Sequence, residues 1–474
     1  MLRNLIVSGA IALVGCGVGF SSGAAAGDNE TAEEKPGYAD ASESSSRYSD
    51  KVLGLKGIED LPERPTPLFE LWQGYVEGGP YDFEFVLPTG MVVSPGLVLF
   101  GNLNNGLEIT DDGVNDTSSA WVTSLNLFLN LTLSGTERVL LGVSPLTRES
   151  GATSQYTFEP TSSWQNESNA RLSTAFFEGE LSEMFPKIDY EGRLPLDYEI
   201  AFGRQPVFAQ GGILISDTMD SVALTRSTIP FPGTNFARIG GLVAWNNVQR
   251  SNNIDDSEGE LYAIFSAVEV EHSTVELDMT YINSTDAIGD QFNIGASFIH
   301  AFIILEHAVD TTFRVAHSLA PDDQTASATN GTLLYLSQSW APKRTDNIVY
   351  LNTFVGFEDY APAARSGGGP LGIAGLSFAG NGLAGGAINN RANEAYGGAL
   401  GYQMFFSPAL RRNLILEVGG KVEEAPGGTD RLSAAVRYSQ AVGRQTFFEV
   451  GGFVVKQESI NEAFGLRTKL SFIF

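Results

Sequence analysis

Few side chains in this sequence could do chemistry, and their spacing describes no catalytic centre. The histidines are His272, His300, His307 and His317, and none has the spacing of ligands around a metal ion. Ser318 follows His317 directly, but neighbouring residues of a strand face opposite sides and cannot act as a catalytic pair. We therefore expect no enzyme activity, no metal ion and no cofactor.

Charged side chains within alternating segments indicate a different chemistry, the sorting of ions and polar solutes in water. Carboxylates and guanidinium groups that face each other across a narrow opening would select solutes by charge. The candidate residues for such a pore constriction, chosen from their positions in the pattern, are Asp217, Asp220, Arg204, Arg314, Arg437 and Lys469. They need a rigid frame that brings distant parts of the chain around one opening.

The end of the chain indicates what that frame is. Leu470, Phe472 and Phe474 share one face of a predicted strand, whereas Arg467 and Lys469 share the other. An apolar stripe of period two that ends on an aromatic residue is typical of a strand with lipid outside and water inside. We interpret Leu470, Phe472 and Phe474 as a C-terminal assembly signal read by the barrel-assembly machinery.

The same alternation recurs from about Leu97 onward, with connections that alternate in length. The short connections are 441–444, 407–412, 341–346 and 272–274, and the long ones are 422–430, 358–394, 318–331 and 246–259. Outer-membrane barrels place short turns on the periplasmic side and long loops outside. The predicted fold class is all-β, a transmembrane antiparallel β-barrel of about 16–18 strands with an N-terminal acidic tether.

The front of the chain indicates export. Residues 1–26 combine a basic start, an apolar run and a small-residue segment ending at Ala26, which predicts a cleaved signal peptide. Cys16, the single cysteine, closes a lipobox-like Leu-Val-Gly-Cys, so lipidation of Cys16 is the alternative. Residues 27–75 form an acidic low-complexity tether, and residues 76–474 form the barrel.

Composition supports a large exported β-protein. The chain is 43% hydrophobic, but its mean hydropathy is -0.03, as expected when apolar and polar residues alternate. Its net charge of -27 argues against binding to nucleic acid, because phosphates would be repelled.

Two segments are predicted to shape the opening. Gln205 to Asp220 joins two strands and contains Gly211 and Gly212, and it would fold inward as a constriction. Glu358 to Glu394 is rich in small residues and long enough to enter the lumen or lie over its mouth. The alternative for each segment is an exposed, mobile surface loop.

One stretch resembles a known family. Phe202-Gly-Arg-Gln205, followed by Gly211-Gly-Ile-Leu-Ile-Ser-Asp217, resembles a segment in bacterial outer-membrane porins of the alginate-export type. The resemblance implies an 18-stranded barrel that passes small or polymeric polar solutes.

The sequence therefore predicts an outer-membrane porin that passes small hydrophilic solutes or ions by passive diffusion. Its predicted surroundings are the lipid of the bacterial outer membrane, and its predicted state is a monomer or a homotrimer. The alternative is a surface-exposed structural or binding barrel, or a lipidated β-sandwich, without channel activity.

Overall fold

The computed structural model describes residues 65–72, 83–148, 151–188, 194–250, 254–304, 306–379, 387–406, 411–458 and 460–474. The predicted signal peptide 1–26, which includes Cys16, lies outside these residues, as does most of the predicted tether 27–75. In the part of the chain that is described, no helix is long and apolar enough to cross a membrane.

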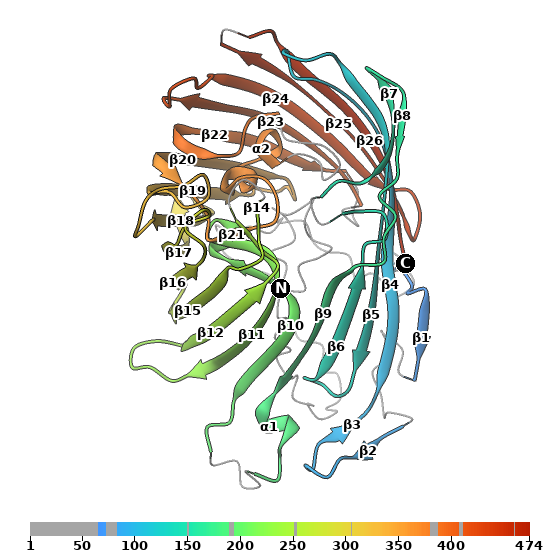
Figure 1. Ribbon diagram of the computed structural model, residues 1–474, viewed down its shortest axis with the longest axis vertical. Coiled ribbons are helices and arrows are strands. Elements are labelled where there is room, and N and C mark those ends of the chain that lie inside the picture. The colour runs from blue at the N-terminus through green and yellow to red at the C-terminus, as the bar shows by residue number, and fades with distance from the viewer. Residues whose placement is uncertain are drawn as a thin grey trace.

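Strands form one closed antiparallel barrel of 18 strands (Figure 1), the upper of the two predicted strand numbers. Two barrel strands are interrupted, so that β6 with β7 makes one and β8 with β9 the next. In order around the wall, the strands are β4 (Gly96–Asp111), β5 (Ser118–Thr132), β6 (Arg138–Val143) with β7 (Ser154–Glu159), β8 (Ser163–Gln165) with β9 (Leu172–Glu180), β10 (Tyr198–Ala209), β11 (Ile215–Ile229), β12 (Phe236–Asn246), β15 (Glu260–Val270), β16 (Ser273–Asn283), β17 (Gln291–Ile304), β18 (His307–Leu319), β19 (Gly331–Trp340), β20 (Ile348–Tyr360), β22 (Ala392–Phe405), β23 (Arg412–Glu423), β24 (Arg431–Ala441), β25 (Thr446–Gln457) and β26 (Ala463–Ile473).

The barrel closes between its first and last strands. β26 pairs with β4 over ten registered positions, from Phe464 opposite Asp111 to Ile473 opposite Asn102. Phe474 then exchanges two backbone hydrogen bonds with Gly101, of 2.7 and 3.0 Å. Because the sheet closes on itself in this way, the β-sandwich alternative is excluded.

The alternation predicted from the sequence separates the two faces of the wall. Leu466 and Phe472 of β26 are 51% and 39% exposed on the outer face, whereas Arg467 and Ser471 are 8% exposed on the inner face. The outer face is apolar because lipid offers no hydrogen bonds, and the inner face can be charged because water or other polar groups meet it. This arrangement is that of a barrel in a lipid bilayer.

The connections sort by length at the two ends, with one exception. The links after β15, β17, β22 and β24 lie at the same end as the C-terminus and are short, and the long link 361–391 lies at the other end. The exception is the link 181–197, which is long, contains α1 (Leu181–Met184) and lies at the C-terminal end. The predicted sorting is therefore confirmed for the second half of the chain but not for residues 181–197.

The segment before the barrel also joins the sheet. β1 (Phe69–Leu71) pairs with β4 at Leu97–Leu99, on the edge of β4 just beyond the end of β26. β2 (Phe85–Val86) and β3 (Val92–Val93) form a small hairpin that lies near α1 in Figure 1, where Lys187 donates a hydrogen bond to the carbonyl of Pro88 (2.8 Å). Residues 69–71 of the predicted tether are thus part of the barrel seam.

Candidate functional site: an internal shelf in the barrel

The hairpin of β10 and β11 leaves the barrel wall partway along its length. β10 pairs with β9 as far as Arg204, and β11 pairs with β12 as far as Asp220. Beyond these residues the two strands pair with each other up to their turn at η2 (Gln210–Gly212). The prediction that the segment from Gln205 to Asp220 folds inward is confirmed, but the segment is a paired β-hairpin almost to its turn and not an irregular loop.

An ion pair marks the point where the hairpin bends. The Arg204 guanidinium contacts both carboxylate oxygens of Asp220, at 2.8 and 3.0 Å. The side-chain amides of Asn246 and Asn247 donate to the same carboxylate, at 2.7 and 2.9 Å. Gly203 has a φ of 118°, and a Cβ there would collide with the carbonyl oxygen of Ala175. The bend therefore requires a glycine beside the ion pair.

One face of the hairpin packs on the inner wall. The apolar cluster there contains hairpin residues and inward-facing residues of β12, β15 and β16: Val207, Ala209, Ile215, Met219, Leu242, Ala244, Leu261, Ala263 and Ile282. The Gln210 amide donates to the carboxylate of Asp278 on β16 (2.8 Å). At Gly211 a Cβ would lie 2.9 Å from the guanidinium carbon of Arg314, so the tip of the hairpin rests against β18.

A second inward segment lies between β20 and β22. It contains β21 (Ala364–Arg365), η4 (Pro370–Ile373) and α2 (Leu376–Ala379). The carboxylate of Glu417 on β23 accepts hydrogen bonds from the backbone N–H groups of Leu376 and Ser377 (2.7 and 2.8 Å) and from the hydroxyl of Tyr350 (2.5 Å).

Further contacts hold this segment to neighbouring strands. Asn352 of β20 donates to the carbonyl of Ala374 (2.8 Å), and Ser377 donates to Ser433 of β24 (3.0 Å). Since Asn352, Glu417 and Ser433 are buried on the inner face of the wall, the segment lies inside the barrel. The prediction that the Glu358 to Glu394 region enters the lumen is confirmed, with the inward part confined to residues between β20 and β22.

The two inward segments are joined. β21 pairs in parallel with β11, with Ala364 opposite Ile215. The Arg365 guanidinium donates to the carbonyl of Gly212, and the Tyr360 hydroxyl donates to the carbonyl of Ile213 (3.1 Å). Burial lowers the pKa of Arg365 to about 10, which still leaves it charged at neutral pH.

We name the joined structure the internal shelf, and define it as residues 205–219 together with residues 361–379. It covers the inner wall from β12 to β24 through the contacts described above. The described wall that it leaves uncovered runs from β25 through β26 and β4 to β9. The shelf therefore lies on one side of the barrel interior, and this part of the described wall forms the other side.

The structure separates the predicted constriction residues into three groups. Arg204 and Asp220 are brought together at the bend. Asp217 is 5% exposed and accepts a hydrogen bond from the backbone N–H of Gln249 (2.7 Å), which lies in β13 (Val248–Arg250) of the link between β12 and β15, so its carboxylate is buried against that link. The expectation that Asp217 faces the opening is wrong. Asp217 and Asp220 are an odd number of residues apart in the strand, so their side chains lie on opposite faces of the hairpin.

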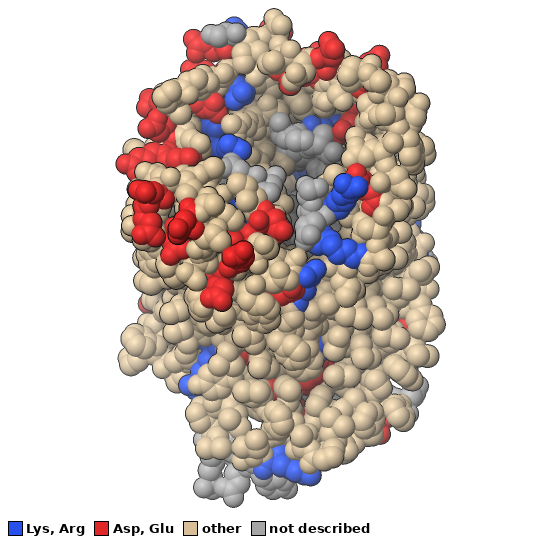
Figure 2. Space-filling view, in the orientation of Figure 1, with Lys and Arg blue, Asp and Glu red and all other residues tan. Residues whose placement is uncertain are grey.

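Arg314 lies under the tip of the hairpin, whereas Arg437 and Lys469 face the lumen from β24 and β26. Four neighbouring strands carry residues in register here: Arg437 on β24, Gly451 on β25, Arg467 on β26 and Glu108 on β4. Lys469 lies 3.5 Å from the carboxylate of Glu449. Figure 2 shows basic side chains bordering the hollowed mouth and acidic side chains on the rim beside it.

Sequence reasoning missed the residues that anchor and join the shelf, Glu417, Tyr350 and Arg365. Glu417 belongs to the regular polar face of a strand, and nothing in the alternation distinguishes it from neighbouring polar positions. One signal was available, because a carboxylate between apolar inward neighbours such as Ile415 and Gly419 needs a partner. The identity of that partner depends on the register of several strands.

A closed barrel with an apolar outer face, a charged inner face and inward segments is the fold of the outer-membrane porins, and the bacterial outer membrane is where such barrels lie.

No family model matches this chain, and no curated protein matches it significantly. Three solved structures from Pseudomonas aeruginosa are similar. The outer membrane protein opdK has a TM-score of 0.54 at 12% identity, covering 80% of this chain and 98% of that chain. OccK5 (OpdH) has a TM-score of 0.52 at 10% identity over 80% and 98%, and OpdO has 0.50 at 11% over 80% and 97%.

Proposed function

We propose that this protein is an outer-membrane porin through which small hydrophilic solutes or ions pass by passive diffusion. The observation that supports it best is the internal shelf, which is tied to the wall at Asp278 and Glu417 and joined at Arg365. A partition fixed to the wall narrows the passage through the barrel. Because the partition does not move, it does not close that passage. No catalytic role is proposed.

Selectivity in this proposal comes from the charged groups that border the passage. Arg204 and Asp220 lie at the bend where the hairpin leaves the wall, and Arg437 and Lys469 lie on the inner face of β24 and β26. Charges of both signs across a narrow opening orient polar solutes and exclude apolar ones. Arg314 supports the tip of the hairpin in this scheme.

The porin-like motif has a structural explanation in this chain. Gly203 makes the bend, Arg204 forms the ion pair, and Gln205 donates to the hydroxyl of Ser221 (2.9 Å). Because these residues are occupied by the bend, we propose small solutes rather than an alginate-like polymer as the cargo. Monomeric or homotrimeric assembly, and insertion directed by Leu470, Phe472 and Phe474, are further parts of the proposal.

The test is single-channel conductance of the purified mature protein in a planar bilayer under a KCl gradient. Stepwise openings would support the porin, and the sign of the reversal potential would report the preferred ion. Heat-modifiable migration on a denaturing gel supplies the control that the barrel is folded. Silence from folded protein would contradict the proposal and favour a structural or binding barrel.

A further inference from the structure

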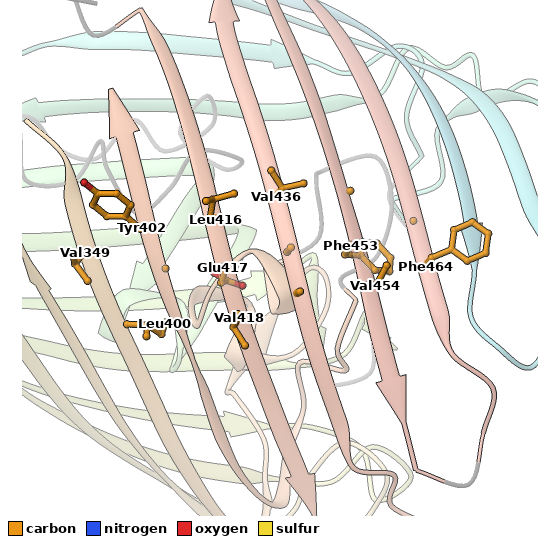
Figure 3. Close-up of a pocket in the computed structure, with 15 residues that line it drawn as sticks. Val349, Leu400, Tyr402, Leu416, Glu417, Val418, Val436, Phe453, Val454 and Phe464 are labelled. Carbon is orange, nitrogen blue, oxygen red and sulfur yellow. The ribbon is translucent and has the colours of Figure 1, made fainter. Parts of the chain in front are cut away.

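An apolar groove crosses the outer face of the barrel over β20 to β26 (Figure 3). It encloses about 910 Å³. The large side chains along it are exposed, as expected on the outer face of the wall: Leu400 53%, Leu416 46%, Val418 56%, Val436 42%, Val454 61% and Phe464 43%. The groove therefore opens toward the hydrocarbon of the membrane and not toward the lumen.

Small residues make the groove hollow. Ala434 is exposed between Val418 and Val454, its partners on the adjacent strands, and Gly452 lies between Val436 and Leu466 in the same way. At Gly452 an added Cβ would meet the carbonyl oxygen of Gly465 at 3.2 Å and otherwise only ordinary contacts. The recess therefore lies where Ala434 and Gly452 stand between larger side chains of the outer face.

The shape of the groove suits an extended chain. Its lining residues form two neighbouring rows across the strands, one through Tyr402, Leu416 and Val436 and the other through Leu400, Val418 and Val454. Six strands lie side by side here, so the groove is about 24 Å long at ~4.8 Å per strand. Because strands in such barrels are tilted, a groove perpendicular to them slants through the bilayer.

A basic side chain lies beside the groove, next to its row through Val454. Lys456 is exposed, stands two residues after Val454 on the same face of β25, and is in register with Leu432. Lys456 lies near the end of the wall that carries the long link between β20 and β22, and outer-membrane barrels place such loops outside. Among the described strand residues on the lipid-facing side, Lys456 is the one Lys or Arg in the external half of the wall.

We propose that the groove is a specific binding site for a lipopolysaccharide molecule of the outer leaflet, with one acyl chain along Ala434 and Gly452 and a lipid A phosphate on Lys456. Apolar contact gives no net hydrophobic gain inside a membrane, so binding depends on close packing in the recess and on the phosphate. The apolar recess supplies the close packing, and Lys456, the external cation beside it, supplies the contact with the phosphate. The proposal concerns the outer face and does not depend on channel activity.

The test is native mass spectrometry of the full-length purified barrel, stripped of lipid by detergent exchange and titrated with purified lipid A. We expect a complex of one lipid A per barrel. Ala434→Leu fills the recess while keeping the outer face apolar, and it should abolish that complex. Ala296→Leu is the matched control, because Ala296 is exposed on the outer face of β17, outside the groove.

Lys456→Gln tests the headgroup separately. It should weaken binding of lipid A but leave binding of zwitterionic phosphatidylethanolamine unchanged. Equal lipid A binding by Ala434→Leu and Ala296→Leu would overturn the groove, and an unchanged titration of Lys456→Gln would overturn the phosphate contact. If Ala434→Leu instead dissociates an oligomer that binds no lipid A, the groove is an interface between copies and the proposal is wrong.

Discussion

Arg204 and Asp220 form a two-contact ion pair, of 2.8 and 3.0 Å, at the point where the β10–β11 hairpin turns from the wall into the lumen. Each side chain is 20% exposed. The pair joins the two strands of the hairpin, and Asn246 ties the same carboxylate to β12. It therefore fixes the angle of the hairpin, and through the hairpin the position of the whole shelf.

Breaking this pair should loosen the hairpin. Arg204→Gln removes both contacts, and we expect it to destabilise the docked hairpin by about 1.5 kcal/mol, or roughly tenfold in its detached population. Single-channel recordings should show larger and noisier openings than wild type. The charge-swapped double variant Arg204→Asp with Asp220→Arg should restore quiet openings in part, and equal noise in the single and double variants would argue against the pair as the hinge.

Glu417 should control the second half of the shelf. Glu417→Gln keeps the size of the side chain but weakens its bonds to the backbone of Leu376 and Ser377, which are charge-assisted. We expect the mean conductance to rise and to fluctuate. Glu449→Gln is the matched control, because Glu449 faces the same lumen from β25 and contacts Lys469 rather than the shelf. Similar recordings from both variants would contradict an anchoring role.

Ion selectivity should depend on the cationic side chains of the inner wall. Removing a positive charge with Arg437→Gln or Lys469→Gln should move the reversal potential toward cation preference. The shift should be larger in about 0.1 M than in about 1 M KCl, since the screening length falls from about 10 to about 3 Å. Arg314→Gln should shift the potential less, because that guanidinium lies beneath Gly211. A larger shift from Arg314→Gln would place the narrowest point at the tip of the hairpin instead.

Much of the wall could be predicted because strand physics is local. The alternation around Leu470 and Phe472 marks the outer face without reference to any other strand, and the lengths of the connections then give the direction of most strands. The shelf could not be predicted in this way. The contact of Gln210 with Asp278 joins residues 68 positions apart and depends on the pairing of every strand between them.

The candidate residues show the same limit. Arg204 and Asp220 could be marked as functional from their charge and position, but their pairing depends on the register of β10 with β11. Asp217 was misplaced because a charged residue in a presumed loop was assumed to face water. In the hairpin it occupies the same face as Ile215 and Met219, and its carboxylate accepts a hydrogen bond from the Gln249 backbone N–H in the link between β12 and β15.

The seam of the barrel gives the last prediction. β26 ends opposite Asn102, and beyond the Phe474–Gly101 bonds the edge of β4 is covered by β1, with the N–H of Leu68 donating to the carbonyl of Leu99 (2.8 Å). Leu68→Pro removes this donor and should lower the free energy of unfolding by about 1 kcal/mol. The temperature at which the barrel loses its heat-modifiable migration should fall. Leu68→Ala retains the N–H and should behave like wild type, so that an equal fall in both variants would assign the effect to the lost side chain and not to the closure of the seam.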